Sequence, residues 1–322
     1  MGFIVATCDL ARLPPDRSPR HLLETSRVTS DDPLDRDKSR LLALPSPFPL
    51  EPGTLRLVEP AAGLDAEQLD TLRKGTFGHP FIIDNGRTRN LFFTTEAVQS
   101  TMFLDDPHAL IAPYTRKMMA FLLFRPAPRH VLMIGLGGGS LAKFCYRHLP
   151  RTRITVVEIN AEVIALRDEF AIPPNDARLE IIHADGAAFL NEGNHFPDIV
   201  LVDAFDESGV APSLATSGFY ERARQCIAPD GVLVMNLSGL KSRYAVHIER
   251  IRATFRGPIR VVPVDEEDNV LLFAFARPHL AQLADPLLQN RAQYLERSLG
   301  LQFSRYLARL RAAHILQSEA LT

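Results

Sequence analysis

Two strand-like segments near residue 265 constrain the fold most, because very little chain separates them. The segments IRVVPV (259–264) and NVLLFAFA (269–276) are rich in β-branched and apolar residues, and only the acidic stretch DEED lies between them. A parallel crossover needs a dozen or more residues. The two segments are therefore predicted to pair antiparallel, as a hairpin.

The chain before this hairpin alternates between strand-like and helix-like segments. The predicted strands are HVLMIGL (130–136), RITVVEI (153–159), LEIIHAD (179–185), DIVLVDAF (198–205) and GVLVMNL (231–237). The predicted helices are SLAKFCYRHL (140–149), AEVIALRDEF (161–170), FYERARQCI (219–227) and YAVHIERIRATF (244–255). This rhythm is typical of a parallel sheet covered by helices on both faces. Together with the terminal antiparallel hairpin, it predicts an α/β fold with a mostly parallel, doubly wound sheet of the class I methyltransferase type.

Composition and turn signals divide the rest of the chain. Residues 1–50 are rich in Pro, Arg, Asp and Ser and are predicted to form a flexible leader. Residues 51–104 carry short strand patterns around an Asn85-Gly86 pair, which predicts a small antiparallel β domain that includes one short helix, AEQLDTLRKG. The α/β domain is expected over 105–285, opening with a helix over 107–124, and covering helices over 286–322.

Charge and cysteine usage exclude several classes of protein. The 322 residues carry a formal net charge of -2 and no run of Lys and Arg, so no nucleic-acid partner is expected. Cys8, Cys145 and Cys226 are scattered and odd in number, which favours neither a metal site nor a disulfide framework and indicates a cytoplasmic protein. No apolar run is long enough to predict a membrane span.

A glycine-rich loop follows the first predicted strand of the α/β region. Gly135, Gly137, Gly138 and Gly139 allow a tight turn and a close approach of the backbone to a ligand before the helix begins at Ser140. Three other interpretations stay open here. The glycines could serve helix–strand packing alone, the loop could hold the pyrophosphate of NAD, or Ser140 could be the nucleophile of a hydrolase.

Acidic residues end the next three predicted strands. Glu158 lies about 20 residues after the loop, where a carboxylate can accept both ribose hydroxyls of an adenosyl group. Asp185, followed by Gly186, can accept from an adenine amine, or it can cap the next helix. Asp203 ends the fourth strand, with Asp206 close behind. The pattern predicts a site for an adenosyl-bearing donor at the carboxyl edge of the sheet.

These motifs together resemble the spermidine synthase family, more closely its bacterial spermidine-synthase-like members. The resemblance extends over roughly residues 81–278 and rests on VLMIGLGGGS, VVEIN, HADG, LVDAFD and APSLATSGFY, with AVQST upstream. It implies an aminopropyltransferase that uses decarboxylated S-adenosylmethionine as co-substrate and a small-molecule amine as acceptor, commonly as a dimer. The implied donor contacts are Gln99, Gly135, Gly137, Glu158, Asp185 and Gly186. Asp203 would be catalytic, and Asp206 and Tyr114 would lie near the amine.

The sequence departs from the family pattern at the donor. The family usually carries an Asp inside the glycine loop that pairs with the donor's amino group, and here that position is Gly138. Met102 replaces the Glu that usually follows the Gln-x-Thr motif, and Met133 stands where methyltransferases often have an acid. Two other functions therefore stay open: an S-adenosylmethionine-dependent methyltransferase, and a nucleoside-binding or regulatory protein without turnover.

The chemistry of aminopropyl transfer explains why acids would be needed at the fourth strand. A polyamine nitrogen is largely protonated at neutral pH and cannot attack carbon until it loses a proton. Asp203 is predicted to be the base and Asp206 to attract the cation, although both carboxylates could instead cap the following loop. The acidic run 265–268 is expected to be a solvated turn, with a polycation-attracting lip as the alternative.

Overall fold

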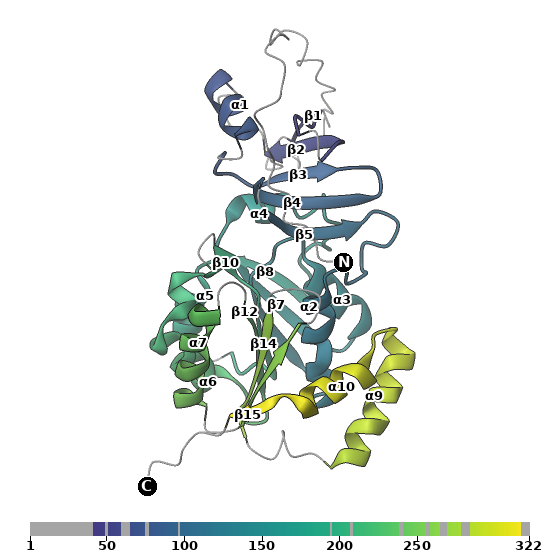
Figure 1. Ribbon diagram of the computed structural model, residues 1–322, viewed down its shortest axis with the longest axis vertical. Coiled ribbons are helices and arrows are strands. Elements are labelled where there is room, and N and C mark those ends of the chain that lie inside the picture. The colour runs from purple at the N-terminus through teal and green to yellow at the C-terminus, as the bar shows by residue number, and fades with distance from the viewer. Residues whose placement is uncertain are drawn as a thin grey trace. The chain divides into compact units, whose positions relative to one another are not determined.

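The computed structural model of the chain describes most of its length. The described residues are 41–48, 51–58, 65–74, 77–95, 97–193, 195–206, 209–237, 241–255, 258–264, 269–277 and 284–316. The predictions made for residues 1–40 and for the acidic run 265–268 lie outside this set. The described chain divides into two compact units (Figure 1). The first contains the residues up to Ala109 together with Gly137–Ser140 and Asn160–Ile172, and the second contains the remainder.

The first unit is built on an antiparallel sheet. Its strands are β1 (Leu41–Pro45), β2 (Thr54–Val58), β3 (Phe81–Asp84), β4 (Thr88–Thr94) and β5 (Ala97–Phe103), paired in that order. The predicted Asn85-Gly86 turn joins β3 to β4, and Gly86 has a φ of +82° there. The Asp65 side chain caps the predicted short helix, α1 (Ala66–Arg73), which lies between β2 and β3 in the sequence. Leu55, Leu57 and Phe81 anchor the core beneath the sheet.

Strand β1 falls inside the range for which the sequence predicts a flexible leader. Its five residues pair along their whole length with β2, from Leu41 opposite Val58 to Pro45 opposite Thr54. The prediction relied on local composition, whereas this strand gains its hydrogen bonds from a partner further along the chain.

The second unit contains the predicted doubly wound sheet. Its eight strands are ordered β15-β13-β14-β12-β9-β6-β7-β8. The parallel strands are β6 (His130–Ile134), β7 (Arg153–Glu158), β8 (Leu179–His183), β9 (Ile199–Val202) and β12 (Val232–Leu237). Next to β12, β14 (Val270–Phe275) and β13 (Ile259–Pro263) pair antiparallel, with Ile259 opposite Ala274. The predicted terminal hairpin is thus confirmed.

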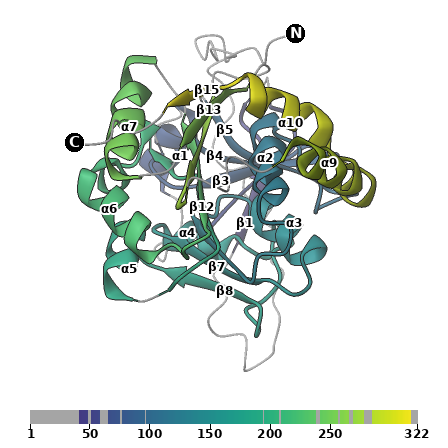
Figure 2. The same cartoon turned by 90° about the horizontal axis from the view of Figure 1, so that it is seen from below.

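Helices cover both faces of this sheet (Figures 1 and 2). On one face lie α5 (Gly186–Glu192), α6 (Ser217–Cys226) and α7 (Lys241–Thr254). On the other lie α2 (Pro113–Met118), continued by the 3₁₀ helix η4 (Met119–Leu123), with α3 (Ser140–His148), α9 (Asp285–Leu299) and α10 (Phe303–Ala312). Gly300, in the left-handed conformation at φ +68°, ends α9 and allows α10 to turn back against it.

Three elements differ from their sequence predictions. The helix expected over 107–124 begins only at Pro113, because proline is favoured in the first turn of a helix. The helix expected over 161–170 is reduced to α4 (Ala161–Ala165), which belongs to the first unit, and turns follow it. The last residues of the described chain add a short strand, β15 (His314–Leu316), beside β13, where only helices were expected.

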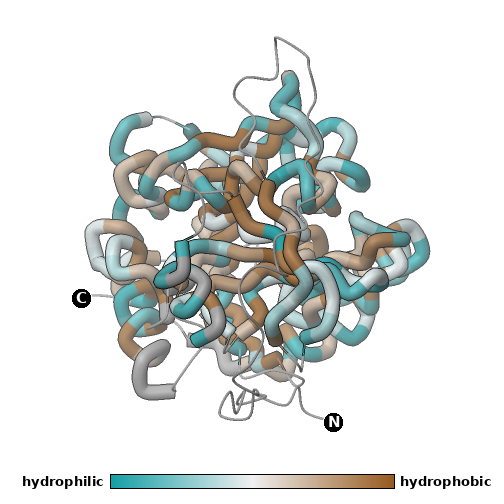
Figure 3. The backbone as a smooth tube through the Cα atoms, turned by 90° about the horizontal axis from the view of Figure 1, so that it is seen from above, coloured by the Kyte–Doolittle hydropathy of each residue, from teal (hydrophilic) through white to brown (hydrophobic). Residues whose placement is uncertain are grey.

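The core explains why the sequences of the parallel strands are continuous apolar runs. All five residues of β6 are buried, since successive side chains point to opposite faces and both faces are covered. Leu132 and Ile134 join the cluster that includes Phe219 of α6 and Ile251 of α7. Figure 3 shows the same pattern along the backbone, with hydrophobic segments inside and hydrophilic ones around them.

Candidate functional site

The strand order fixes where a ligand can bind in the second unit. From β6 the chain proceeds outward through β7 and β8, then returns to β9 on the other side of β6 and continues to β12. Open α/β sheets bind ligands at the carboxyl ends of the strands where the winding reverses in this way. The candidate site therefore lies at the ends of β6 and β9, where the sequence places the glycine loop and Asp203.

Gly135 begins the loop in a conformation that a side chain would not tolerate. It has a φ of +97°, and a Cβ built there would lie only 2.1 Å from the backbone oxygen of Asp203. Its own amide donates to the carbonyl of Val157 at 2.9 Å. The start of the loop is therefore held between the ends of β7 and β9, which requires glycine.

Glu158 is attached directly to this loop. The amide of Leu136 donates to Glu158 Oε2 at 2.8 Å, and the residue is only 8% exposed. The structure thus brings the glycine loop and this carboxylate to the same edge of the sheet. Contact between Glu158 and a ribose stays a prediction.

Asp185 occupies the position that both of its predicted roles require. It is the N-cap of α5, and Oδ1 accepts from the amides of Ala187 and Ala188 at 2.9 and 2.8 Å. Burial raises the pKa of this carboxyl, but these bonds and one from Ser213 outweigh that effect and hold the pKa below its usual value. Gly186 follows at the point where a Cβ would meet the side chain of Ile134 at 2.5 Å. The helix cap is therefore present, and contact with adenine stays a prediction.

Asp203 is a carboxyl group at this edge whose pKa is raised. The residue is half-buried, while the carboxyl group itself is enclosed by protein. Burial raises its pKa, and two hydrogen bonds lower it in part. Asn236 Nδ2 donates to Oδ1 at 3.0 Å, and the Tyr114 hydroxyl donates to Oδ2 at 3.1 Å. A carboxylate with a raised pKa and both oxygens oriented is suited to accept a proton.

Tyr114 is one of the residues predicted from the sequence, whereas Asn236 is not. Tyr114 lies in α2, far from Asp203 in the sequence, and the structure brings the two side chains into contact. Asn236 could have been noticed as the one polar residue in the apolar strand VLVMNL, near its carboxyl end. Whether Tyr114 also contacts a substrate stays a prediction.

Asp206 is placed only by its backbone. Phe205–Asp206 forms the short strand β10, which pairs with β11 (Gly209–Val210) so that Asp206 lies opposite Gly209. The side chain of Asp206 is outside the described part of the structure. Its predicted role at the amine is therefore untested.

The first unit holds the tip of the glycine loop beside β5. Gly137 has a φ of +51°, and a Cβ there would lie 3.8 Å from Ser100 Cβ. A Cβ on Gly138 would lie 2.6 Å from Ser100 Oγ and 2.9 Å from the ring of Phe170. Gln99, the residue before Ser100, is exposed on β5. The position at which the family usually has an Asp is thus closed to a side chain by its neighbours.

The described residues also include the thiols, the histidines and the helices that bear on metal binding and membrane insertion. Within them, no group of three or more His, Cys, Asp and Glu side chains has the arrangement of a metal site. Among the helices that the structure describes, none is long and apolar enough to cross a membrane. Ser140 is the first residue of α3, and the buried thiols of Cys145 and Cys226 are both free.

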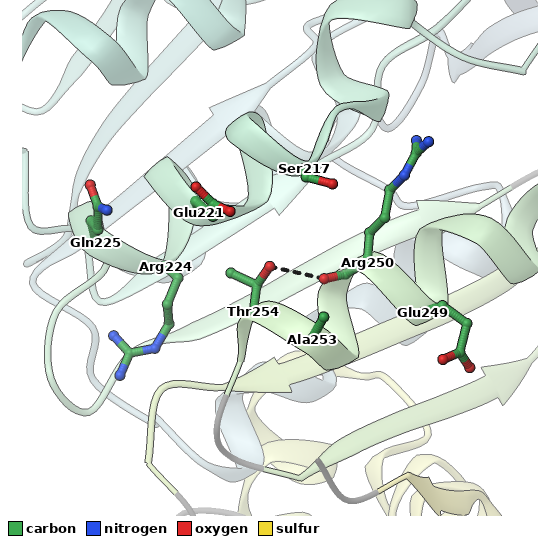
Figure 4. A pocket seen from close by; sticks show the side chains of 8 residues that line it. All are labelled: Ser217, Glu221, Arg224, Gln225, Glu249, Arg250, Ala253 and Thr254. Carbon is green, nitrogen blue, oxygen red and sulfur yellow. Dashed lines mark hydrogen bonds between the residues drawn. The ribbon is translucent and has the colours of Figure 1, made fainter. Parts of the chain in front are cut away.

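A hollow lies between α6 and α7 (Figure 4). Its lining residues are Ser217, Glu221, Arg224, Gln225, Glu249, Arg250, Ala253 and Thr254. It is an open groove of mixed charge in which the Thr254 hydroxyl donates to the carbonyl of Arg250 at 2.9 Å. None of the strand-end residues lines it, so we do not regard it as the candidate site.

Comparison with known proteins agrees with this geometry. Residues 112–250 match the family model described as Spermine/spermidine synthase domain. A polyamine aminopropyltransferase from Neisseria meningitidis is 38% identical over 243 residues, which cover 75% of this chain and 92% of that protein. A solved spermidine synthase in complex with the transition-state analogue AdoDATO has a TM-score of 0.58 at 17% identity and covers 72% of this chain and 81% of its own.

A methyltransferase also resembles part of the chain. Human methyltransferase-like protein 13, solved in complex with SAH, has a TM-score of 0.53 at 25% identity and covers 59% of this chain and 93% of its own. The relative from Neisseria meningitidis matches a larger share of the chain at higher identity. The glycine loop, the strand-end acids, the terminal hairpin and this long match lead to one conclusion: the chain belongs to the spermidine synthase family.

Proposed function

We propose that this protein transfers the aminopropyl group of decarboxylated S-adenosylmethionine to a polyamine-type amine. The observation that carries the proposal is the enclosed carboxyl group of Asp203 at the winding reversal of the sheet. The backbone of Asp203 packs against Gly135, and its carboxyl group is oriented by Tyr114 and Asn236. The chain's similarity to polyamine aminopropyltransferases supports the same activity.

The donor is held, in this proposal, by the glycine loop and the acids beside it. Glu158 accepts from the ribose hydroxyls while the Leu136 amide fixes its second oxygen. Asp185 and Gly186 lie under the adenine, and Gly135 keeps the backbone close to the donor. Gln99 and Gly137 contact the donor's methionine-derived side. Several carboxylates at one edge also favour a cationic sulfonium and a cationic amine.

The transfer itself requires one proton acceptor and correct alignment. Asp203 first takes one proton from the ammonium group of the acceptor. The neutral nitrogen then attacks the methylene carbon bonded to sulfur and forms a C–N bond, which leaves the product nitrogen as a secondary ammonium. The C–S bond breaks, and its electron pair goes to sulfur, which leaves as a neutral thioether. The raised pKa of Asp203 favours its acceptance of the proton that the acceptor loses before attack. Because sulfonium is already a good leaving group, alignment of nitrogen, carbon and sulfur supplies much of the remaining rate.

Methyl transfer is the second candidate, because Gly138 lacks the acid that would select a decarboxylated donor and a human methyltransferase shares the fold. Product analysis separates the two. The protein is incubated with a diamine and either donor, and the nucleoside product is identified by mass spectrometry. We expect methylthioadenosine together with an aminopropylated amine. Formation of S-adenosylhomocysteine together with a methylated amine would instead establish methyl transfer.

Two further features belong to the same proposal. We expect the enzyme to act as a homodimer, as family members commonly do, and light scattering coupled to size-exclusion chromatography measures this directly. We place it in the cytoplasm, since free buried thiols such as Cys145 and Cys226 are typical of a reducing compartment.

A further inference from the structure

A second asparagine extends the hydrogen-bond network of Asp203 into the terminal hairpin. Asn236 is 2% exposed at the end of β12, and its Nδ2 donates to Asp203 Oδ1 at 3.0 Å. Asn269, directly before β14, donates from its own Nδ2 to Asn236 Oδ1 at 2.9 Å. The three side chains come from three separate segments, β9, β12 and the base of the hairpin.

The amide of Asn236 can support the carboxylate in only one of its two orientations. With Nδ2 toward Asp203 it donates to a charged acceptor, whereas with Oδ1 toward Asp203 it would place two acceptors together. Asn269 satisfies the other end of this amide, because its Nδ2 donates to Asn236 Oδ1 on the opposite side. A buried amide left with an unsatisfied end is unfavourable, so the observed orientation is the stable one.

Asn269 is itself held in place by the hairpin. Its backbone carbonyl accepts from the amide of Val264 at 2.9 Å, which closes the base of the β13–β14 turn. The antiparallel pairing of β14 with β12 then brings Asn269 next to the end of β12, where Leu237 lies opposite Val270. The backbone of Asn269 is therefore held in place by the hairpin and by its neighbour in the sheet.

We propose that Asn269 and Asn236 form a positioning relay, in which the hairpin residue fixes the amide of Asn236 and this amide orients the carboxylate of Asp203. The inference rests on the proposed function in one respect: Asp203 must be the group that accepts the proton. Both asparagines act through Asp203, and neither is required to touch a substrate. The network also assigns the terminal hairpin a role beyond completing the sheet.

Groups outside the relay also change the pKa of Asp203, and their effects must be distinguished from the effect of the relay. Tyr114 from α2 donates to the other carboxyl oxygen, and burial acts in the opposite direction to both donors. In the described structure, the hydrogen-bond partners that change the pKa of Asp203 are Asn236 and Tyr114, and both are uncharged at neutral pH. If the relay exists, Asn269 changes the pKa of Asp203 only while Asn236 is present.

A double-mutant cycle on the full chain tests this dependence. The variants are Asn236→Leu, Asn269→Ala and the double variant, and the measured quantity is the pKa of Asp203. It is followed by carbon NMR of labelled aspartate side chains, with the signal assigned by its loss in Asp203→Asn. Asn236→Leu should raise the pKa by about 1 unit, the order expected for one hydrogen bond to a charged group. Asn269→Ala should raise it by about half a unit alone and by nothing in the Asn236→Leu background.

Turnover provides the second readout. The acid limb of the pH profile of kcat should move in the same direction as the NMR pKa, and KM for the amine should change less than kcat. Asn175→Ala is the matched control, since it removes an asparagine that makes two backbone hydrogen bonds to Ile181 at a distance from Asp203. It should leave both readouts unchanged.

Three results would overturn the relay: no shift with Asn269→Ala, the same shift in both backgrounds, or a shift with Asn175→Ala. If Asn236→Leu does not fold, Asn236→Ser removes the amide with a smaller change and completes the cycle. Absence of aminopropyl transfer by the unmodified protein would instead contradict the proposed function, and the NMR cycle would still decide on the relay.

Discussion

Enclosing the carboxyl group of Asp203 lowers the stability of the folded chain once this group ionises. Burial raises its pKa above the usual value of 3.8, so the folded chain binds the proton more tightly than the unfolded chain. The contribution of Asp203 to the free energy of unfolding is then fully present below the usual pKa. It is lost as the pH rises through the raised pKa, because the carboxylate must ionise in an enclosed position.

The direction of this pH dependence predicts how Asp203→Asn changes the stability of the protein. The variant carries no ionisable group there, so its free energy of unfolding should exceed that of the unmodified protein above the raised pKa. The difference should increase as the pH rises from the usual pKa to the raised pKa and stay constant above it. Denaturant unfolding from about pH 4 to pH 8 measures it, and a difference that does not grow with pH would contradict the assignment.

The close packing around Gly138 leads to a second prediction about a single residue. Because Ser100 and Phe170 occupy the space, Gly138→Asp should destabilise the protein by about 1–3 kcal/mol rather than restore the family's donor contact. In a Phe170→Ala background, the same Gly138→Asp substitution should cost less, because the ring no longer occupies the space. Calorimetric titration with the intact and decarboxylated donors should show less than about tenfold discrimination by the unmodified protein. Strong preference combined with a well-folded Gly138→Asp variant would be inconsistent with the packing described here.

At the scale of elements, the start of the glycine loop packs directly against the backbone at the end of β9. Gly135→Ala would place a methyl group against the backbone oxygen of Asp203, and backbone at the end of a buried strand cannot move aside easily. We expect a loss of more than about 2 kcal/mol in stability together with loss of donor binding. Gly218→Ala in α6 is the control, since its Cβ would meet no atom within 4 Å, and it should be neutral or stabilising.

Elements also show how far the sequence predicts the structure. The terminal hairpin, the parallel strands and the glycine loop could be identified because short connections and local periodicity determine them. Strand β1 could not because proline-rich and polar sequence surrounds it, although its partner β2 follows closely. Strand β15 could not, since its partner β13 is distant in the chain. The same reason explains Asn236 and Asn269, whose contact with each other and with Asp203 appears only when the strands are assembled. Asp185 remained ambiguous because a helix cap and an adenine contact need the same residue at the same position.

For the whole molecule, binding of the donor should couple the candidate site to stability. A ligand that binds only the folded chain raises its stability in proportion to the logarithm of concentration over Kd. An adenosyl thioether should therefore raise the Tm of the unmodified protein. Glu158→Ala should reduce this rise, with an affinity loss of about 10- to 100-fold, because the ribose and the Leu136 amide both lose their acceptor.

The control for that measurement lies on the neighbouring strand. Glu180 is an exposed acid on β8, and Glu180→Ala removes the same charge without touching the glycine loop. Its Tm should rise with the ligand as in the unmodified protein. Equal losses for both variants would indicate a general effect of charge and would argue against a specific ribose contact.

The central claim, that Asp203 accepts the proton of the attacking amine, is tested most directly by the rate of aminopropylated product formed by Asp203→Asn under saturating donor and amine. General-base catalysis typically contributes about 10²- to 10⁴-fold, so we predict a fall of at least about 100-fold while the Kd of the donor changes only a few-fold. An Asp203→Asn variant that is folded, binds the donor and forms product at the unmodified rate would contradict the account.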